Sequence, residues 1–173
     1  METEIQIEQN IEMPTGAVWQ AVINKDVAAL LDAIKNGELL NERHGVDLWT
    51  PLMYVCAYGD KKIARVLLSK KALINAQTRL GHTVLMLMVA KGDISMAEML
   101  IKARAGINKK TDKSITALMI AACKNDMKMV NLLLKNNANP CLKNNFEQNA
   151  ADMARMHGHY KVAAVIEQAI SKR

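Results

Sequence analysis

Aromatic residues are scarce in this sequence of 173 residues. Two Trp, three Tyr and one Phe are present, although half of all residues are apolar. A core must therefore be built from Leu, Ile, Val, Ala and an unusual twelve Met, which suits packing between helices better than a β-sandwich. The scarcity also makes nucleic acid an unlikely partner, because single strands are bound by aromatic side chains that stack on bases.

Long hydrophobic runs are also missing. No uninterrupted apolar run is longer than residues 84–90, far short of the roughly 20 residues that span a membrane. The acidic beginning of the chain lacks the apolar segment of a secretory signal peptide. Cys56, Cys123 and Cys141 form an odd set without a C-x-x-C spacing. We therefore expect reduced thiols and a cytoplasmic protein with no membrane span.

Motifs of common enzymes are absent as well. The sequence has no G-x-x-x-x-G-K-[ST] phosphate loop, no H-E-x-x-H zinc motif and no G-x-S-x-G nucleophile elbow. Cys56 falls on the packed side of an expected helix and should be inert. Cys123 is more exposed by the same register, but no base stands at a motif-like spacing from it. We therefore expect no enzyme activity and no cofactor.

A segment that recurs at a constant spacing organises the chain. Its first three copies read Thr-x-Leu-Met and a fourth begins with Asn. The copies start at Thr50, Thr83, Thr116 and Asn149, each 33 residues after the last without insertion or deletion. A fixed period of this length is typical of proteins built from stacked repeats.

The period divides the chain into a tail and a repeat domain. We place an acidic, flexible tail at residues 1–16 and a repeat domain at residues 17–173, with approximate repeats at 17–44, 45–77, 78–110, 111–143 and 144–173. The tail holds four Glu and no Lys or Arg, which gives it a charge of −4. Because the total charge is +6, the repeat domain carries a charge of +10. The tail is either a frayed terminus or an acidic strip that folds back on the basic body.

Each unit predicts two short helices joined by a turn. The four residues that begin the copies suit N-caps, and Pro51 suits the first helical position. The first helices should end at the turn residues Gly59, Gly92, Asn125 and Gly158. Apolar residues then recur with a helical period, as in Ile63, Val66 and Leu67. Helices of about ten residues are too short to be stable alone, so each unit must pack on the next.

The unit resembles the ankyrin repeat in its Thr-Pro-Leu start, its Gly-Asp or Gly-His turn and its Ala-x-x-Asn ending, over roughly residues 17–170. The resemblance implies an all-α ankyrin-repeat solenoid of about five helix–turn–helix repeats joined by β-hairpin loops. The chain departs from the pattern where Met53, Met86, Met119 and Asp152 replace the usual His. It also departs where Lys71, Arg104 and Asn137 replace the Gly after the second helix, at a cost of roughly 1 kcal/mol for a left-handed Lys or Arg.

The resemblance also implies binding, through the finger-like loops and the exposed side of the first helices, and no catalysis. We expect large apolar residues at the finger tips: Trp49, Leu80, Ile115 and Phe146. We expect an inner row of Tyr58, Lys91, Lys124 and His157, each 33 residues from the last, with His82 and Lys113 nearby. The tip residues could instead pack along neighbouring fingers, and the inner row could be solvated turn residues. The other lysines are expected on solvated faces.

We therefore predict a monomeric scaffold or adaptor that binds an acidic segment of another protein. In a variant of this hypothesis, the tail occupies the basic groove until a partner displaces it. Alternatives are a secreted bacterial effector that acts on a host protein, and a binder of nucleic acid or membrane surfaces by charge alone. His157, His159 and Asp152 could suggest a metal site, but His159 follows a turn Gly, where the repeat pattern commonly places His, so a structural role is favoured.

Overall fold

The protein is built from ten helices in two layers. The computed structural model describes residues 14–172, and this part of the chain contains no β-strand. The helices are α1 (Ala17–Ile23), α2 (Val27–Lys35), α3 (Pro51–Ala57), α4 (Lys61–Ser69), α5 (Val84–Lys91), α6 (Ile94–Lys102), α7 (Ala117–Cys123), α8 (Met127–Lys135), α9 (Ala150–Met156) and α10 (Tyr160–Ser171). The predicted all-helical repeat fold is confirmed.

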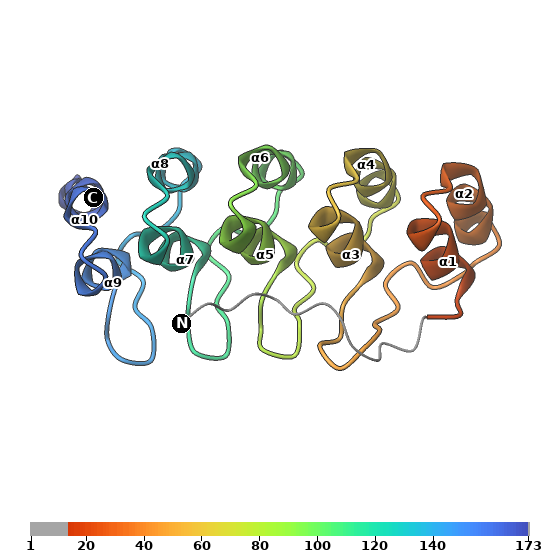
Figure 1. Ribbon diagram of the computed structural model, residues 1–173, viewed down its shortest axis with the longest axis horizontal. Coiled ribbons are helices and arrows are strands. Elements are labelled where there is room, and N and C mark those ends of the chain that lie inside the picture. Colours follow the sequence, from red (N-terminus) through yellow and green to blue (C-terminus); the bar gives the residue numbers. More distant parts are fainter. Residues whose placement is uncertain (1–13, 173) are drawn as a thin grey trace.

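The helices pack as pairs that stand side by side along one axis. Each odd-numbered helix contacts the even-numbered helix that follows it, and α3, α5, α7 and α9 form a continuous inner layer. Figure 1 shows the pairs in a row, with α1 and α10 at opposite ends and the long loops on the same side of the inner layer. Residues that are 33 positions apart in the sequence therefore lie one helix pair apart along the molecule. No helix of residues 14–172 is long and apolar enough to cross a membrane.

The predicted N-caps of the inner helices are present. The Thr50 hydroxyl accepts the backbone N–H of Met53 at 3.3 Å, and Thr83 and Thr116 repeat this contact at 3.4 Å. Asn149 accepts the N–H of Asp152 at 3.1 Å, while Asp152 accepts the N–H of Asn149 in return. Each cap satisfies an amide that the first turn of a helix leaves without a partner.

Aspartates cap the outer helices in the same way, which the sequence analysis did not predict. Asp26, Asp60, Asp93 and Asp126 each accept the backbone N–H three residues later, at 2.9–3.0 Å. A carboxylate at this position also interacts favourably with the helix dipole. Three of the six acidic side chains in residues 45–143, those of Asp60, Asp93 and Asp126, therefore bind backbone amides instead of pairing with lysines.

The turn residues adopt the left-handed conformations that the pattern requires. Gly59, Gly92, Asn125 and Gly158 have φ between 56° and 79° at the turns between paired helices. Lys71, Arg104 and Asn137 have φ of 65–66° just after the outer helices. A side chain with a Cβ is strained in this conformation. Lys71 and Arg104 therefore occupy positions where glycine would have a lower conformational energy.

Methionines occupy three of the positions where the repeat pattern usually has histidine. Met53, Met86 and Met119 are fully buried in one continuous apolar core, beside leucines such as Leu52 and Leu85. Unbranched thioether side chains fill irregular space between stacked helices well. Trp19 is the one aromatic residue in the core of the described chain, in line with the aromatic-poor composition.

The expected β-hairpin form of the long loops is not confirmed. Isolated bridges join His44 to Trp49 and Gln77 to Thr83, but no strand forms in residues 14–172. Neighbouring loops are nevertheless linked by backbone hydrogen bonds, from Arg79 N–H to the Asp47 carbonyl at 2.9 Å and from Asn145 N–H to the Lys113 carbonyl at 3.3 Å. The loops thus form one connected layer beneath the inner helices.

The last helix pair presents a polar outer face. Arg155 contacts Asp152 of the same helix at 3.6 Å and forms an ion pair with Glu167 of α10. Thirty-three residues earlier these positions hold Met119, Ala122 and Leu134, which are buried in the apolar core or packed against it. Charged residues at these positions are expected of a repeat whose outer face meets water.

Candidate functional site

The predicted inner row lies along one edge of the molecule. Tyr58, Lys124 and His157 are the residues directly after α3, α7 and α9, and Lys91 is the last residue of α5. All four side chains are exposed, Tyr58 to 53%. Because the inner helices stack in register, adjacent members should be about 8–10 Å apart. The structure therefore brings together residues that are 33 positions apart in the chain.

Two members of the row already make contacts within the protein. Lys91 Nζ donates to the carbonyl of Ala57 at 2.5 Å, and His157 Nδ1 lies 2.8 Å from the carbonyl of Met153. The Lys91 contact stabilises the C-terminal end of α3, because an ammonium group there satisfies an unpaired carbonyl. An ammonium group has three N–H donors, so two remain for a ligand. The side chain of Lys124 has no hydrogen bond or ion pair to any described residue.

A second row, which the sequence analysis missed, runs beside the first. Tyr54, Leu87, Ile120 and Met153 lie four residues before the members of the inner row and are half-buried against the core. Residues four apart share one face of a helix, and this spacing could have revealed the row in the sequence. The inner helices thus offer an apolar strip bordered by two lysines, a tyrosine and a histidine.

The predicted row of exposed apolar finger tips is partly wrong. Leu80 and Phe146 are exposed, to 61% and 75%, but Trp49 and Ile115 are half-buried against the core. The reason is register. Trp49 and Ile115 directly precede an N-cap, where the chain turns into the inner helix, whereas Leu80 and Phe146 lie two residues farther out on the loop. Only the second position points into water.

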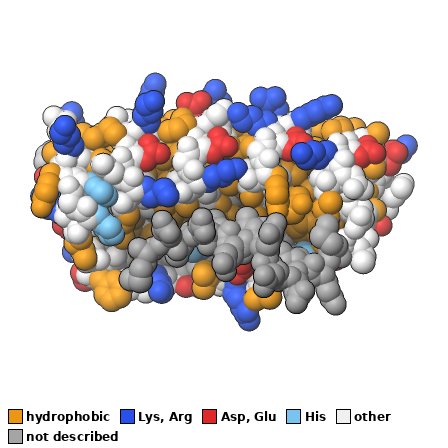
Figure 2. All heavy atoms as spheres, in the orientation of Figure 1, with side chains coloured by type: hydrophobic (Ala, Val, Ile, Leu, Met, Phe, Trp, Pro, Cys, Tyr) orange, Lys and Arg blue, Asp and Glu red, His pale blue; other side chains and the backbone are white. Residues whose placement is uncertain are grey.

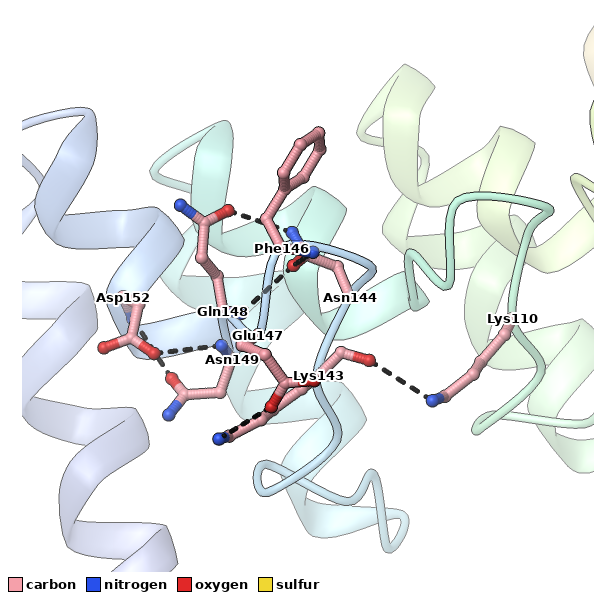
Figure 3. A network of polar contacts seen from close by, with 8 residues as sticks. All are labelled: Lys110, Lys143, Asn144, Phe146, Glu147, Gln148, Asn149 and Asp152. Atoms are coloured by element: carbon pink, nitrogen blue, oxygen red, sulfur yellow. Dashed lines mark hydrogen bonds and ion pairs between the residues drawn. The ribbon is translucent and has the colours of Figure 1, made fainter.

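A polar network holds the Phe146 loop in shape. The Asn144 side-chain oxygen accepts the N–H groups of Phe146 at 2.9 Å and Gln148 at 3.1 Å. Lys143 forms an ion pair with Glu147 at 3.1 Å, and Lys110 Nζ donates to the carbonyl of Lys143 at 3.2 Å. Figure 3 shows the Phe146 ring pointing away from these contacts. The ring is therefore presented to solvent on a braced loop.

The remaining predicted residues of the loop layer, His82 and Lys113, differ in exposure. Lys113 is exposed, whereas His82 is half-buried. Burial lowers the pKa of His82, against the opposing effect of the Asp112 and Asp47 carboxylates. A histidine with a lowered pKa is neutral near pH 7. Positive charge at this site therefore comes from Lys113 and the inner row, and not from His82.

Aromatic side chains cluster at the α1 end of the apolar strip. The ring centroid of Trp19 lies 5.9 Å from that of Tyr54 and 5.7 Å from that of His44, and Tyr54 lies 4.4 Å from Tyr58. Burial raises the pKa of Tyr54, and the neighbouring Tyr58 raises it further. Sequence reasoning missed this cluster, because its members come from α1, a loop and α3.

His159, the candidate metal ligand, has a structural contact. Its Nε2 lies 2.9 Å from the carbonyl of Cys123, and its ring stacks on that of His157 at 6.0 Å. Within residues 14–172 no group of three or more His, Cys, Asp or Glu side chains could hold a metal ion. The contact with Cys123 ties the last repeat to the one before it, as Lys91 ties its repeat to Ala57.

The cysteines differ in burial and in acidity. Burial raises the pKa of the Cys56 thiol to about 12, with Asp93 adding to the rise and Lys91 opposing it. Burial also raises the pKa of Cys123. Cys141 is exposed. Because the thiolate is the reactive form, Cys56 is inert in the folded protein, as expected.

Uncompensated positive charge is the dominant electrostatic feature. Residues 61–143 hold sixteen Lys and Arg but four Asp and Glu. Of these cations, only Lys143 forms an ion pair with another residue of the described chain. Figure 2 shows Lys and Arg side chains crowding the edge formed by the outer helices. Such a field attracts anionic partners.

Comparison with known families supports the repeat assignment. A family model described as ankyrin repeats (3 copies) matches residues 18–111 and again residues 85–171. The two matches together cover all ten helices of the described chain except Ala17, the first residue of α1. A comparison with curated proteins found no match.

Proposed function

The chain belongs to the ankyrin repeat family, whose members generally mediate protein–protein interactions, and we propose that it binds an extended, acidic segment of a partner protein. The segment would lie along the apolar strip, with its carboxylates beside Lys91 and Lys124 and its apolar residues on Tyr54 and Tyr58. Phe146 and Leu80 would add contacts from the loops. The observation that carries the proposal is the exposed, cationic inner row beside a half-buried apolar strip.

The geometry of the row restricts the partner's sequence. Adjacent members are separated by about the 8–10 Å of helix packing, and an extended chain advances about 3.3 Å per residue. One repeat therefore matches about three residues of the partner. A segment with Asp or Glu at every third position would place successive carboxylates beside Lys91 and Lys124.

Selection from a library of random peptides on the full-length protein tests the proposal. The enriched peptides should carry acidic residues three positions apart. Lys91→Glu combined with Lys124→Glu should weaken their binding by at least about tenfold, because like charges then face each other. The matched control reverses Lys62 and Lys128, which are exposed on the outer helices. Equal losses in both variants, or enrichment of peptides without acidic residues, would contradict the proposal.

The hypothesis that the tail occupies the groove concerns residues 1–16, of which residues 1–13 lie outside the described residues. It remains testable with the same peptides. Deletion of residues 1–16 should tighten peptide binding if the tail competes for the inner row, and unchanged affinity would rule the competition out.

A further inference from the structure

A second cationic surface lies at the C-terminal ends of the outer helices. Lys35, Lys102 and Lys135 are the last residues of α2, α6 and α8, and Lys70 directly follows α4. All four are exposed. With Lys71 and Arg104 they form what we call the C-terminal edge. The inner row lies at the C-terminal ends of the inner helices, which run opposite to their outer partners, so the two surfaces are on opposite sides.

Helix dipoles explain only some of these cations. A positive side chain in the last turn of a helix is favourable, and Lys70 and Lys102 already supply one for α4 and α6. Lys71 and Arg104 stand beyond the helix ends with φ of 65° and 66°. Glycine would relieve the strain at both positions. Backbone strain persists mostly where it serves a function, and here it places two further cations on the same edge.

Two exposed leucines lie next to the cations. Leu39 and Leu73 are 69% and 59% exposed, in the connections that follow α2 and α4. The connections are tied together, because the N–H of Leu73 donates to the Asn41 side chain at 2.8 Å. Leu73 is two residues from Lys71, whereas Leu39 is four residues from Lys35 and directly follows the exposed Glu38. Large apolar side chains beside basic residues are typical of proteins that bind at the surface of a membrane.

We propose that the C-terminal edge docks on a membrane surface rich in anionic phospholipids. Lys and Arg side chains contact the headgroup phosphates, and Leu39 and Leu73 enter the boundary between headgroups and acyl chains. A nucleic acid would offer the same phosphates but gives no role to the leucines. Residues 59–145 also contain no aromatic side chain on which a base could stack. Because the edge is separate from the inner row, this docking is independent of partner binding.

Vesicle co-sedimentation of the full-length protein tests the docking. With phosphatidylserine and phosphatidylcholine at moderate salt, Lys71→Gly combined with Arg104→Gly should lower the affinity about 25-fold, from roughly fivefold per cation. Relief of strain should meanwhile keep the variant folded. The matched control is Asn137→Gly, which changes the equivalent left-handed position without removing charge and should bind as the wild type does.

Two further variants test whether binding depends on a local site or on net charge, and whether the edge binds lipid or nucleic acid. Lys62→Gln combined with Lys128→Gln removes two charges elsewhere and should cost much less affinity than the edge variant. Leu39→Ser combined with Leu73→Ser should weaken vesicle binding several-fold and leave binding to a DNA or RNA oligonucleotide unchanged. The proposal is overturned if the wild type does not bind anionic vesicles, or if both charge variants lose the same amount of affinity for them. It is also overturned if the leucine variant binds vesicles as the wild type does.

Discussion

At the scale of single residues, the left-handed cations make a prediction that runs against ordinary expectation. Lys71→Gly should stabilise the protein by about 1 kcal/mol, because glycine adopts a positive φ without strain. The neighbouring Lys70→Gly should destabilise it by roughly 0.5–1 kcal/mol, because Lys70 has φ of −91° and gains nothing from glycine's freedom. Urea denaturation of the two variants gives both free energies of unfolding.

The same comparison has an internal control at the equivalent position of the fourth repeat. Asn tolerates the left-handed conformation better than Lys does, so Asn137→Gly should stabilise the protein by less than Lys71→Gly. If all three glycine variants were destabilised alike, the loss of chain stiffness in the unfolded state would dominate, and strain at Lys71 could not be the explanation.

The thiols provide a second prediction at this scale. At neutral pH a thiol reagent such as iodoacetamide should modify Cys141 first, Cys123 more slowly and Cys56 only when the protein unfolds. Mass spectrometry of the timed reaction identifies each site. Because the Cys56 pKa is about 12 in the folded state and near 9 in an exposed thiol, the unfolded chain loses this proton first as pH rises. Stability should therefore fall above pH 9, and less so in Cys56→Ala.

At the scale of helices, the buried N-cap hydroxyls should contribute more to the free energy of unfolding than their small size implies. Thr83→Ala should destabilise the protein by about 1 kcal/mol, because the amide of Met86 then loses its partner in a buried site. Thr83→Ser keeps the hydroxyl and should recover most of the loss. Thermal unfolding followed by circular dichroism measures both. Equal destabilisation of the two variants would assign the effect to packing of the Thr methyl group.

Local chemistry explains which elements could be predicted from the sequence. The caps at Thr50 and Thr83 and the turns at Gly59 and Gly92 depend on backbone groups within four residues, so the residue pattern was sufficient. The loops were less predictable, because a strand needs partners that the residue pattern does not specify. The caps of the outer helices are equally local, and the Asp before each of α4, α6 and α8 is the residue in the sequence that indicates them.

The candidate site was predicted less well than the fold, because exposure depends on register within a loop. Trp49 and Leu80 differ by two positions in the repeat, and this small difference decides between contact with the core and contact with water. The position of the inner row needed only the period and a helix end, and its four members are exposed at the ends of the inner helices, while their role in binding stays a prediction. The aromatic cluster of Trp19, Tyr54 and Tyr58 depends on tertiary contacts that no local pattern contains.

At the scale of the whole molecule, excess charge should make stability depend on salt. The middle repeats hold cations with almost no ion pairs, and Asp93 and Asp126 cap helices, so mutual repulsion is relieved mainly by ions from solution. Raising NaCl from about 20 mM to about 200 mM shortens the Debye length from about 20 Å to below 10 Å. The unfolding midpoint should rise over this range, and anionic polymers should raise it at much lower concentrations.

Variants that remove charge without touching the core test this explanation. Lys62→Gln combined with Lys128→Gln should raise the midpoint at low salt and reduce its dependence on NaCl, because both side chains are exposed and unpaired within residues 14–172. Lys143→Gln should in part lower the unfolding midpoint, because this variant also breaks the ion pair between Lys143 and Glu147. A midpoint that did not change with salt in the wild type would show that the lysines repel one another too weakly to matter, and anion binding would then need local contacts instead of the general field.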